Sequence, residues 1–402
     1  MRVKSVWVLA LLALAVPAAA QTAAPPDPKP TFEIYGFAML DMGHDFKQIH
    51  PDFFDTMRVT RLPSVEKEFG EDNRTFAGVR QSRLGFRSSS QTALGELKTQ
   101  FEIDMFGTGA DAGQTTIRLR HAWGEVGAFG AGQTVSPFMD IDVFPNSLEY
   151  WGPTGMVFFR NVQVRFTPMR GANTFMVALE RPGASGDTGV YADRIELQNI
   201  KPRFPVPDVS AAFKATRNWG YVRVGGMLRA MKWDDVLADQ FDLSGSATGW
   251  GINLSSNLNA GKKDVVRLAY VFGEGIQNYM NDSPIDVGIV RDTTSTITPV
   301  RGEAIPVQGI TAFLDHTWSE EFTSAVGYSW QENDNTSGQA PNAFRTGHYA
   351  LGNVLYTPVP NVMVGAELQW GRRENFSDGF QSDGLKLQFA FKYNFSAKLG
   401  GQ

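Results

Sequence analysis

The sequence predicts an all-β protein, a 16-stranded antiparallel transmembrane β-barrel. Short segments in which apolar and polar residues alternate recur along the chain, as in strands with one face in hydrocarbon and one in water. After residue 20, no apolar run approaches the ~18 residues of a membrane helix. The chain combines 41 Gly and 29 Phe with a mean hydropathy of −0.22. This composition is typical of a barrel, because only one residue in two faces lipid.

Residues 1–20 have the pattern of a secretory signal peptide. Arg2 and Lys4 precede an apolar run from Val6 to Val16, and Ala18–Ala20 supplies a cleavage site of small residues. The alternative is an N-terminal membrane anchor, but this run is too short to span ~30 Å of hydrocarbon. We therefore expect export from the cytoplasm and cleavage after Ala20.

Charge and cysteine content exclude several classes of function. Of the 37 basic residues, two lie in the predicted signal peptide, which leaves 35 against 42 acidic residues and a mature net charge of −7. Bulk attraction to nucleic acid is therefore not expected. The chain has no cysteine, so neither disulfides nor thiolate metal sites stabilise it.

Regular alternation begins at Thr31 and defines sixteen candidate strands, most near the ~9–11 residues that a tilted membrane strand needs. They are 31–42, 76–88, 96–106, 116–126, 127–135, 157–167, 174–181, 209–217, 221–233, 247–257, 264–273, 307–318, 322–332, 344–357, 361–371 and 385–395. The predicted barrel therefore covers residues 31–395. A Pro/Ala-rich periplasmic linker (21–30) precedes it and a short C-terminal tail (396–402) follows it.

The lengths of the connections alternate as well. Connections 43–75, 182–208 and 274–306 are long, whereas 218–220 and 319–321 are tight turns. Outer-membrane barrels have long extracellular loops and short periplasmic turns. The alternation predicts an even number of strands, with both termini in the periplasm.

The last candidate strand, 385–395, shows the alternation most clearly. One face is apolar and comprises Leu385, Leu387, Phe389, Phe391, Tyr393 and Phe395. Such a strand would aggregate at the edge of a soluble sheet, whereas a closed barrel in lipid accommodates it. Aromatic residues near strand ends, such as Trp330 and Trp370, fit interfacial girdles. Single tryptophans also occur in soluble cores, so the girdle interpretation depends on the sixteen strands.

Strand parity places a set of arginines on the water-filled face. In QSRLGFRS (81–88), Arg83 and Arg87 alternate with Leu84 and Phe86. A charge at the lipid midplane costs ~2–4 kcal/mol, so the arginines should face the lumen. The same reasoning places four more arginines inside, namely Arg118, Arg120, Arg165 and Arg267. Arg80 and Arg160 have the opposite parity and are left out, as residues of the rim or of a bulge.

This set of arginines predicts anion-selective passive diffusion of small solutes. Rings of arginine favour anions in pores, and guanidinium groups bind carboxylates through two parallel hydrogen bonds. The alternative is a solvated wall whose charges balance nearby carboxylates.

Residues 136–155, SPFMDIDVFPNSLEYWGPTG, are too apolar for a loop surrounded by water. We expect this loop to fold into the barrel as a constriction and to present acidic side chains toward the arginines. The predicted constriction residues are Phe138, Asp140, Asp142 and Glu149. The alternative is a loop that packs against a neighbouring subunit.

No motif supports an enzyme, a metal site or a cofactor. The chain contains no G-x-S-x-G, HExxH or P-loop, and GAFGAG (127–132) does not open a helix. His121 has lipid-facing parity, and Asp104 and Asp111 match no calcium loop. The sequence therefore predicts no catalytic residue.

The chain resembles the DcaP-like trimeric outer-membrane porins. The similar segments are YGFAMLDMGHDF (35–46), DTMRVTRLPS (55–64), RQSRLGFRS (80–88), RLRHAWGEVG (118–127), GQTVSPFMD (132–140) and GEGIQNYMND (273–282). The resemblance implies a sixteen-stranded homotrimer that passes dicarboxylates and similar anions. It also implies that the loop beginning at SPFMD is the constriction and that Arg83, Arg87, Arg118 and Arg120 belong to the selective wall. Residues 21–30 lack the heptads of the helical stalk found in many relatives.

The expected function is therefore that of a porin of the bacterial outer membrane, with no enzyme activity. Its expected partners are outer-membrane lipid, lipopolysaccharide, other copies of the chain and small anionic solutes. A general non-selective porin is the alternative, and an outer-membrane enzyme on a barrel is a more distant one.

Overall fold

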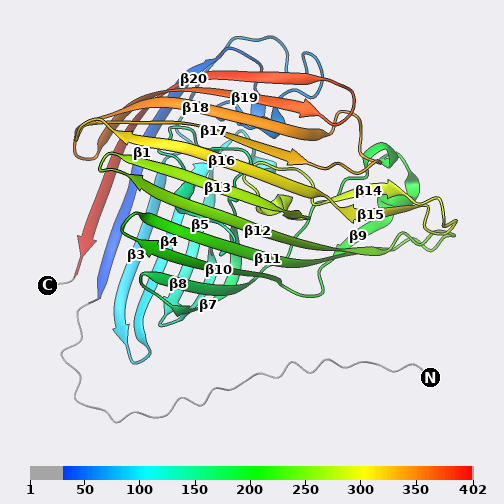
Figure 1. Cartoon of the computed structure of the whole chain (residues 1–402), viewed down its shortest axis with the longest axis horizontal. Helices are drawn as coiled ribbons and strands as arrows, with labels where there is room; N and C mark the ends of the chain where they lie inside the picture. Colours follow the sequence, from blue (N-terminus) through cyan, green and yellow to red (C-terminus); the bar gives the residue numbers. More distant parts are fainter. Residues whose placement is uncertain (1–29, 401–402) are drawn as a thin grey trace.

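The computed structural model describes residues 30–400. The predicted signal peptide and residues 21–29 of the predicted linker therefore lie outside the described residues. Within them, sixteen antiparallel strands form one closed barrel, in which each strand pairs with the next and the last pairs with the first. Figure 1 shows these strands side by side along the length of the molecule.

The barrel strands are β1 (Thr31–Asp45), β3 (Arg83–Thr92), β4 (Gly95–Phe106), β5 (Thr115–Val126), β6 (Phe129–Val135), β7 (Arg160–Met169), β8 (Asn173–Glu180), β10 (Asp208–Arg217), β11 (Gly220–Asp235), β12 (Gly245–Ala260), β13 (Asp264–Glu274), β16 (Pro306–Thr317), β17 (Phe322–Asn333), β18 (Phe344–Val359), β19 (Val362–Asn375) and β20 (Gln381–Leu399). Two short strands join the same sheet, namely β2 (Arg74–Gly78) beside β1 and β9 (Ile200–Arg203) beside β11. Strands β14 (Val287–Arg291) and β15 (Val300–Ala304) form a separate hairpin.

The only helical elements among residues 30–400 are short 3₁₀ turns. They are η1 (Pro51–Phe53), η2 (Val59–Arg61), η3 (Gly109–Asp111), η4 (Ile141–Val143), η5 (Gly189–Tyr191), η6 (Ile195–Asn199) and η7 (Gln277–Tyr279). None of the described residues belongs to a helix long and apolar enough to cross a membrane.

The predicted class and strand number are confirmed, whereas most strand boundaries shift by one to several residues. The candidate strand 76–88 is divided into β2 and β3, because the chain turns between Val79 and Ser82. The last strand continues to Leu399 instead of ending at Phe395. Its additional residues pair with the start of β1, where Leu399 lies opposite Phe32, so their backbone groups are hydrogen-bonded. The predicted tail at 396–402 therefore begins too early.

The connections sort to the two ends of the barrel as expected. Seven turns of two to four residues lie at one end, together with the start of β1 and the end of β20. We call this the turn end. All longer connections lie at the opposite, loop end, where β9, β14 and β15 project in Figure 1. In outer-membrane barrels the turn end is periplasmic and the loop end extracellular.

The two faces of each strand differ in chemistry. On β20, Phe389 points outward and is 43% exposed, whereas its neighbours Gln388 and Ala390 are fully buried. On β11, outward Val222 and Val224 alternate with buried Arg223. The exposed apolar face suits hydrocarbon and the polar face lines the interior.

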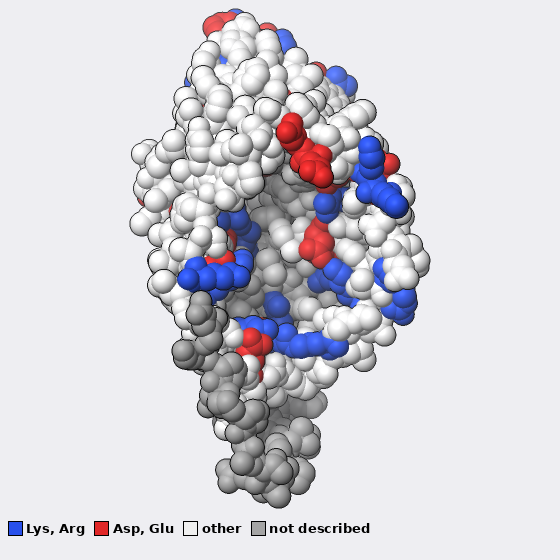
Figure 2. Space-filling view, turned by 90° about the vertical axis from the view of Figure 1, so that its left-hand side faces the viewer, with Lys and Arg blue, Asp and Glu red and all other residues white. Residues whose placement is uncertain are grey.

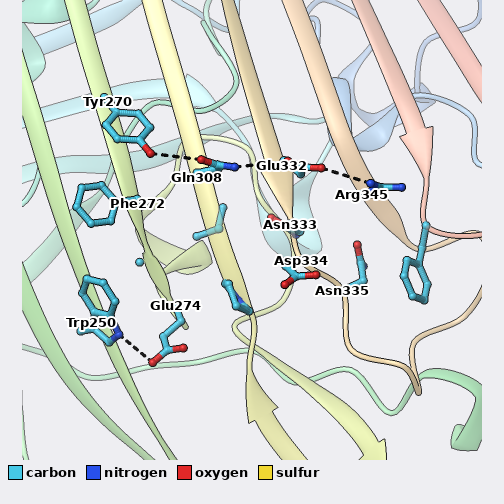
Figure 3. A pocket seen from close by; sticks show the side chains of 14 residues that line it. Trp250, Tyr270, Phe272, Glu274, Gln308, Glu332, Asn333, Asp334, Asn335 and Arg345 are labelled. Atoms are coloured by element: carbon cyan, nitrogen blue, oxygen red, sulfur yellow. Dashed lines mark hydrogen bonds and ion pairs between the residues drawn. The ribbon is translucent and has the colours of Figure 1, made fainter.

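A row of hydrogen-bonded polar side chains on the outer wall marks the limit of that apolar surface toward the loop end. The Tyr270 hydroxyl donates to Gln308 (3.3 Å), whose amide donates to Glu332 (3.5 Å), and Arg345 donates to the same carboxylate (3.5 Å). Figure 3 shows these side chains projecting from adjacent strands beside a groove of about 740 Å³. Closer to the turn end the outward residues of the same strands are apolar, among them Leu268, Ile310, Val326 and Val354. This row of polar side chains therefore lies at the boundary between the hydrocarbon and the lipid headgroups. The groove beside it lies outside the lumen.

Long loops pack inside the barrel and form its apolar clusters. Phe138 and Met139 from one loop and Ile276, Tyr279 and Met280 from another form a cluster against inward residues of the wall. Residues of the loop 46–73 form a second cluster with inward residues of β16 to β18; its loop members are Ile49, Met57, Val59 and Leu62. The interior is therefore partly filled by loops.

The seam between β1 and β3 depends on a glycine. A Cβ atom at Gly36 would lie 2.2 Å from the carbonyl oxygen of Arg83 and 2.8 Å from the Phe395 ring. We expect Gly36→Val to lower the free energy of unfolding by about 1–3 kcal/mol, because the added atoms force the strands apart. Urea unfolding in lipid vesicles measures this. Ala38→Val, at the next outward position, is the control, and equal effects of the two variants would contradict the prediction.

Candidate functional site: an arginine-lined path through the barrel

Neighbouring strands of one side of the barrel carry a group of arginines. We call Arg83, Arg87, Arg118, Arg120, Arg160 and Arg165 the arginine wall. Arg83 and Arg87 project inward from β3, and Leu84 and Phe86 project outward between them, as the alternation of a strand requires. On β7, Arg165 shares the inner face with buried Asn161 and Gln163.

A β-bulge on β5 brings two adjacent polar side chains, Arg120 and His121, to the inner face. Glu102 lies opposite His121, whereas Ile103 lies opposite Leu119, so Arg120 is an extra residue without a partner across the pair. Arg118, Arg120 and His121 therefore all face the interior. The His121 Nδ1 atom lies 2.9 Å from the Thr134 hydroxyl. The prediction that His121 faces lipid is wrong, because the inserted residue Arg120 shifts the alternation of inward and outward side chains by one.

Two buried carboxylates compensate the arginines of β5. Asp104 accepts hydrogen bonds from Arg118 Nη2 (2.7 Å) and Arg120 Nη1 (3.0 Å), and Glu102 accepts one from Arg120 Nε (2.6 Å). Tyr150 donates its hydroxyl hydrogen to Asp104 (2.5 Å). For Arg118 and Arg120, the alternative of a wall balanced by carboxylates is therefore the correct description.

Three other arginines have no hydrogen-bond acceptor among residues 30–400. Arg83 comes only within 3.7 Å of Glu102, whereas Arg87 and Arg160 form no ion pair with the described residues. Each guanidinium lies over an aromatic ring instead. Arg83 is 5.1 Å from Phe37, Arg87 is 4.0 Å from Tyr35 and Arg160 is 4.9 Å from Phe158, measured to ring centroids.

Arg160 and Arg80, which parity left out, have different roles. Arg160 lines the same cavity as Arg118 and Arg120, so its exclusion from the set was wrong. Arg160 is the first residue of β7, and it lies beyond the last paired residues of β5 and β6. The alternation of inward and outward side chains therefore does not determine which face its side chain takes. Arg80 is only 1% exposed and forms an ion pair with Asp55. Its side chain therefore holds the loop 46–73 against the barrel wall and does not line the path.

Two cavities lie on the arginine side. The outer cavity, of about 430 Å³, is lined by Arg58, Arg118, Arg120 and Arg160 together with Tyr150, Trp151 and the amides of Gln277 and Asn278. A second cavity, of about 470 Å³, is lined by Arg87 and Lys98 with Gln100 and Trp123. Figure 2 looks into the turn end and shows a hollow mouth with Lys and Arg gathered around it. The arginine wall therefore runs from one cavity toward the other.

The loop 136–159 contacts the inner wall of the barrel. The Asn253 amide donates to the Phe138 carbonyl (2.9 Å), and Asp140 accepts from Tyr221 (2.8 Å) and Ser255 (2.6 Å). Asp142 binds Lys214 Nζ at 2.6 Å. These partners lie on β10 to β12, so Asp140 and Asp142 face away from the arginine wall, contrary to the expectation from sequence. Tyr150 is the loop residue that meets the arginines, and its ring stacks on Phe106 at 4.1 Å.

Glu149 fixes this loop to the loop 46–73. Its carboxylate accepts the backbone N–H groups of Met57 (3.2 Å) and Trp151 (3.0 Å), and the side chain is 2% exposed. Burial raises the pKa of the Glu149 carboxyl to about 8, which outweighs the opposite effects of nearby Lys386 and of these N–H groups.

The structure brings five of the six predicted arginines to one side and separates the sixth. Arg267 lies on β13 and binds Asp315 at 2.6 Å, beside a different cavity of the turn end. Parity could have found Arg223 and Arg229 on β11, which face inward and are buried. Strand alternation could not have identified Arg58 as a residue of the interior, because it lies in a loop. Its guanidinium is 3.0 Å from Asp282 and stacks on Phe53 and Trp151.

A closed sixteen-stranded barrel with an apolar outer face and a polar interior defines a channel of the porin class. A family model described as DcaP outer membrane protein matches residues 33–395, and the chain belongs to that family of the outer membrane. The outer membrane channel DcaP of Acinetobacter baumannii has the same fold, with a TM-score of 0.76 and 19% identity over 91% of this chain and 97% of that chain.

Two further solved structures share the fold at lower similarity. The anion-selective porin from Comamonas acidovorans is 10% identical over 92% of this chain and all of that chain, with a TM-score of 0.53. The trimer form of OmpT from Vibrio cholerae is 13% identical over 91% and 99% of the two chains, with a TM-score of 0.54. No curated protein matches the chain in sequence.

Asp104 holds two cations of the arginine wall, so its charge is required for stability. We expect Asp104→Asn to lower the free energy of unfolding by about 3–5 kcal/mol, because Arg118 and Arg120 then lose a buried partner. Urea unfolding in lipid vesicles measures the loss. Asp111→Asn, at an exposed position in the next loop, is the control. Equal unfolding free energies for the two variants would show that the ion pairs do not stabilise the barrel.

The raised pKa of Glu149 predicts a pH-dependent loop. The pKa of a glutamate carboxyl is ordinarily ~4.3, so the folded loop favours the protonated form of Glu149. The contribution of protonated Glu149 to the stability of the loop is complete at acid pH and is lost as the pH rises through about 8. We expect the open-channel conductance to change between pH 7 and pH 9. Glu149→Gln should remove the change, whereas Glu71→Gln, at an exposed position, should retain it. Single-channel recording from pH 6 to 10 tests this, and an unaltered step in Glu149→Gln would contradict it.

Proposed function

We propose that this channel conducts small anions, with dicarboxylates as the favoured class, by passive diffusion. The observation that carries the proposal is the excess of cations on one side of the lumen. Four arginines, Arg83, Arg118, Arg120 and Arg160, surround two carboxylates, Glu102 and Asp104. The local charge is therefore about +2, although the chain as a whole is acidic. Such a field attracts anions and excludes cations.

The two cavities give the solute its route. An anion enters at the loop end, reaches the outer cavity between Arg58 and Arg160, passes the contact of Tyr150 with Arg120, and leaves past Arg87 at the turn end. The loop 136–159, with Phe138, Asp140, Asp142 and Glu149, narrows the lumen, and its aspartates hold it against the opposite wall. Arg267 lies off this route and serves the turn-end mouth.

Binding along the route is weak enough for release. A charge pair at ~4 Å contributes about 1 kcal/mol in bulk water and roughly 4 kcal/mol at an effective dielectric of 20, before desolvation. A dissociation constant near ~1 mM corresponds to about −4 kcal/mol. Tighter binding would slow the departure of each solute.

The proposal includes export by the N-terminal signal peptide, assembly into a homotrimer and an outer surface in contact with lipid and lipopolysaccharide. The trimer form of Vibrio cholerae OmpT and the anion-selective porin of Comamonas acidovorans support it, since this fold accommodates both properties. The proposal includes no enzyme activity, in keeping with channels as the proteins of similar fold.

A general non-selective porin is the second candidate, because the compensated pairs of Arg118 and Arg120 reduce the free charge of the wall. Such a porin would conduct K⁺ and Cl⁻ in proportion to their mobilities. It would also be indifferent to dicarboxylates.

Reversal potentials distinguish the two candidates. In a planar bilayer under a KCl gradient, we expect a reversal potential that favours Cl⁻ and a current that millimolar succinate reduces. Succinamide, which has the same carbon skeleton without charge, is the control and should leave the current unchanged. Cation selectivity, or equal currents with and without succinate, would exclude the proposed function and leave the channel class intact.

A further inference from the structure

The arginine wall contains two kinds of guanidinium, those that donate hydrogen bonds to protein groups and those without an acceptor among residues 30–400. We infer that Arg160, Arg83 and Arg87 are the groups that bind the permeating carboxylate, in that order from the loop end, and that Arg118 and Arg120 are positioning residues. This inference rests on the proposed function and identifies its selective residues.

Arg118 and Arg120 already use most of their nitrogen donors on protein groups; among residues 30–400 only Nη1 of Arg118 and Nη2 of Arg120 have no side-chain or backbone acceptor. Arg118 places Nε and Nη2 on the two oxygens of Asp104, at 3.1 and 2.7 Å. Arg120 divides its donors between Glu102, Asp104 and the Tyr150 hydroxyl. A new carboxylate that took the Nε and Nη2 position of Arg118 would have to replace the buried Asp104, whose desolvated charge would then lose that partner.

Arg160 has the opposite properties. Among residues 30–400, no acceptor lies within hydrogen-bonding distance of its guanidinium, and its Nε atom is buried without a partner. The Phe158 ring lies against the guanidinium, and the side chain lines the outer cavity beside the neutral amides of Gln133, Gln277 and Asn278. A buried donor without an acceptor is costly. A carboxylate in the cavity would supply the missing acceptor through two parallel hydrogen bonds.

Arg83 and Arg87 continue this arrangement toward the periplasm. They lie four residues apart on the same face of β3, which corresponds to ~13 Å along the strand. Arg83 is near the outer cavity, because it approaches the same Glu102 oxygen that Arg120 binds. Arg87 lines the turn-end cavity. A carboxylate released from Arg160 therefore meets two further guanidiniums, each on an aromatic ring, before it reaches the mouth.

Two other arginines of this side, Arg58 in the outer cavity and Arg165 of the arginine wall, have protein partners. Arg58 donates twice to Asp282 and lies between two aromatic rings. Arg165 donates to Gln163 from Nε (3.0 Å) and Nη2 (2.8 Å). The difference in hydrogen bonding thus selects three members of the arginine wall.

The test compares single-residue variants of the full-length protein by the succinate concentration that halves the KCl current in a planar bilayer. For Arg160→Gln we expect this concentration to rise about tenfold, as for the loss of one charge-assisted hydrogen bond. Arg160→Lys should give a smaller rise, because it keeps the charge without the planar fork. Arg345→Gln is the matched control, since that arginine lies on the outer wall.

Folding and selectivity are separable in this experiment. Arg160 donates no hydrogen bond to a described residue, so Arg160→Gln should fold like the wild type, as heat-dependent mobility on gels would show. A half-blocking concentration in Arg160→Gln equal to that of Arg345→Gln, with a clear block of the wild type, would overturn the inference alone. Absence of block in the wild type would instead overturn the proposed function.

Discussion

The requirement that every backbone hydrogen-bonding group inside a membrane has a partner determines the rest of this structure. Hydrocarbon offers no hydrogen bonds, so the sheet has to close on itself. The closure is made by β20 and β1, which pair from Phe32 with Leu399 to Asp45 with Lys386. This pairing uses the residues beyond Phe395 and places Gly36 beneath the Phe395 ring. Once the sheet is closed, each side chain faces either lipid or the lumen.

Closure also sets the electrostatics of the interior. Charged residues that alternate with apolar ones are turned inward together, which brings arginines and carboxylates of neighbouring strands within contact distance. In a partly dry lumen a charge is most stable when it is paired. Glu102 and Asp104 therefore bind Arg118 and Arg120, and the smaller number of carboxylates leaves Arg83, Arg87 and Arg160 without a hydrogen-bond acceptor among the described residues. The same pairing that stabilises the wall thus determines which cations remain available.

The loops determine where the free space lies. Leu148 and Glu149 donate their backbone N–H groups to Glu367 on β19, and Gly155 donates to Gln331 on β17. With the loop 46–73 and the segment around Tyr279, they fill the side of the barrel away from β3 to β7. Two of the cavities that remain border the arginine wall. The position of the open space in this channel thus depends on the packing of loops against one side of the barrel.

Sequence alone determined the class, the sixteen strands and the inward position of Arg83, Arg87 and Arg165, because a period of two is a local property that each strand carries by itself. Three features required the tertiary structure. The bulge at Arg120 inserts one residue and reverses the parity after it, which brings His121 inside. Asp140 and Asp142 turn toward β10 to β12, although sequence suggested the arginines as their partners. Above all, the pairing of Arg118 and Arg120 and the unpaired state of Arg160 follow from contacts between strands, and no alternation along one strand encodes which charges of its neighbours lie opposite.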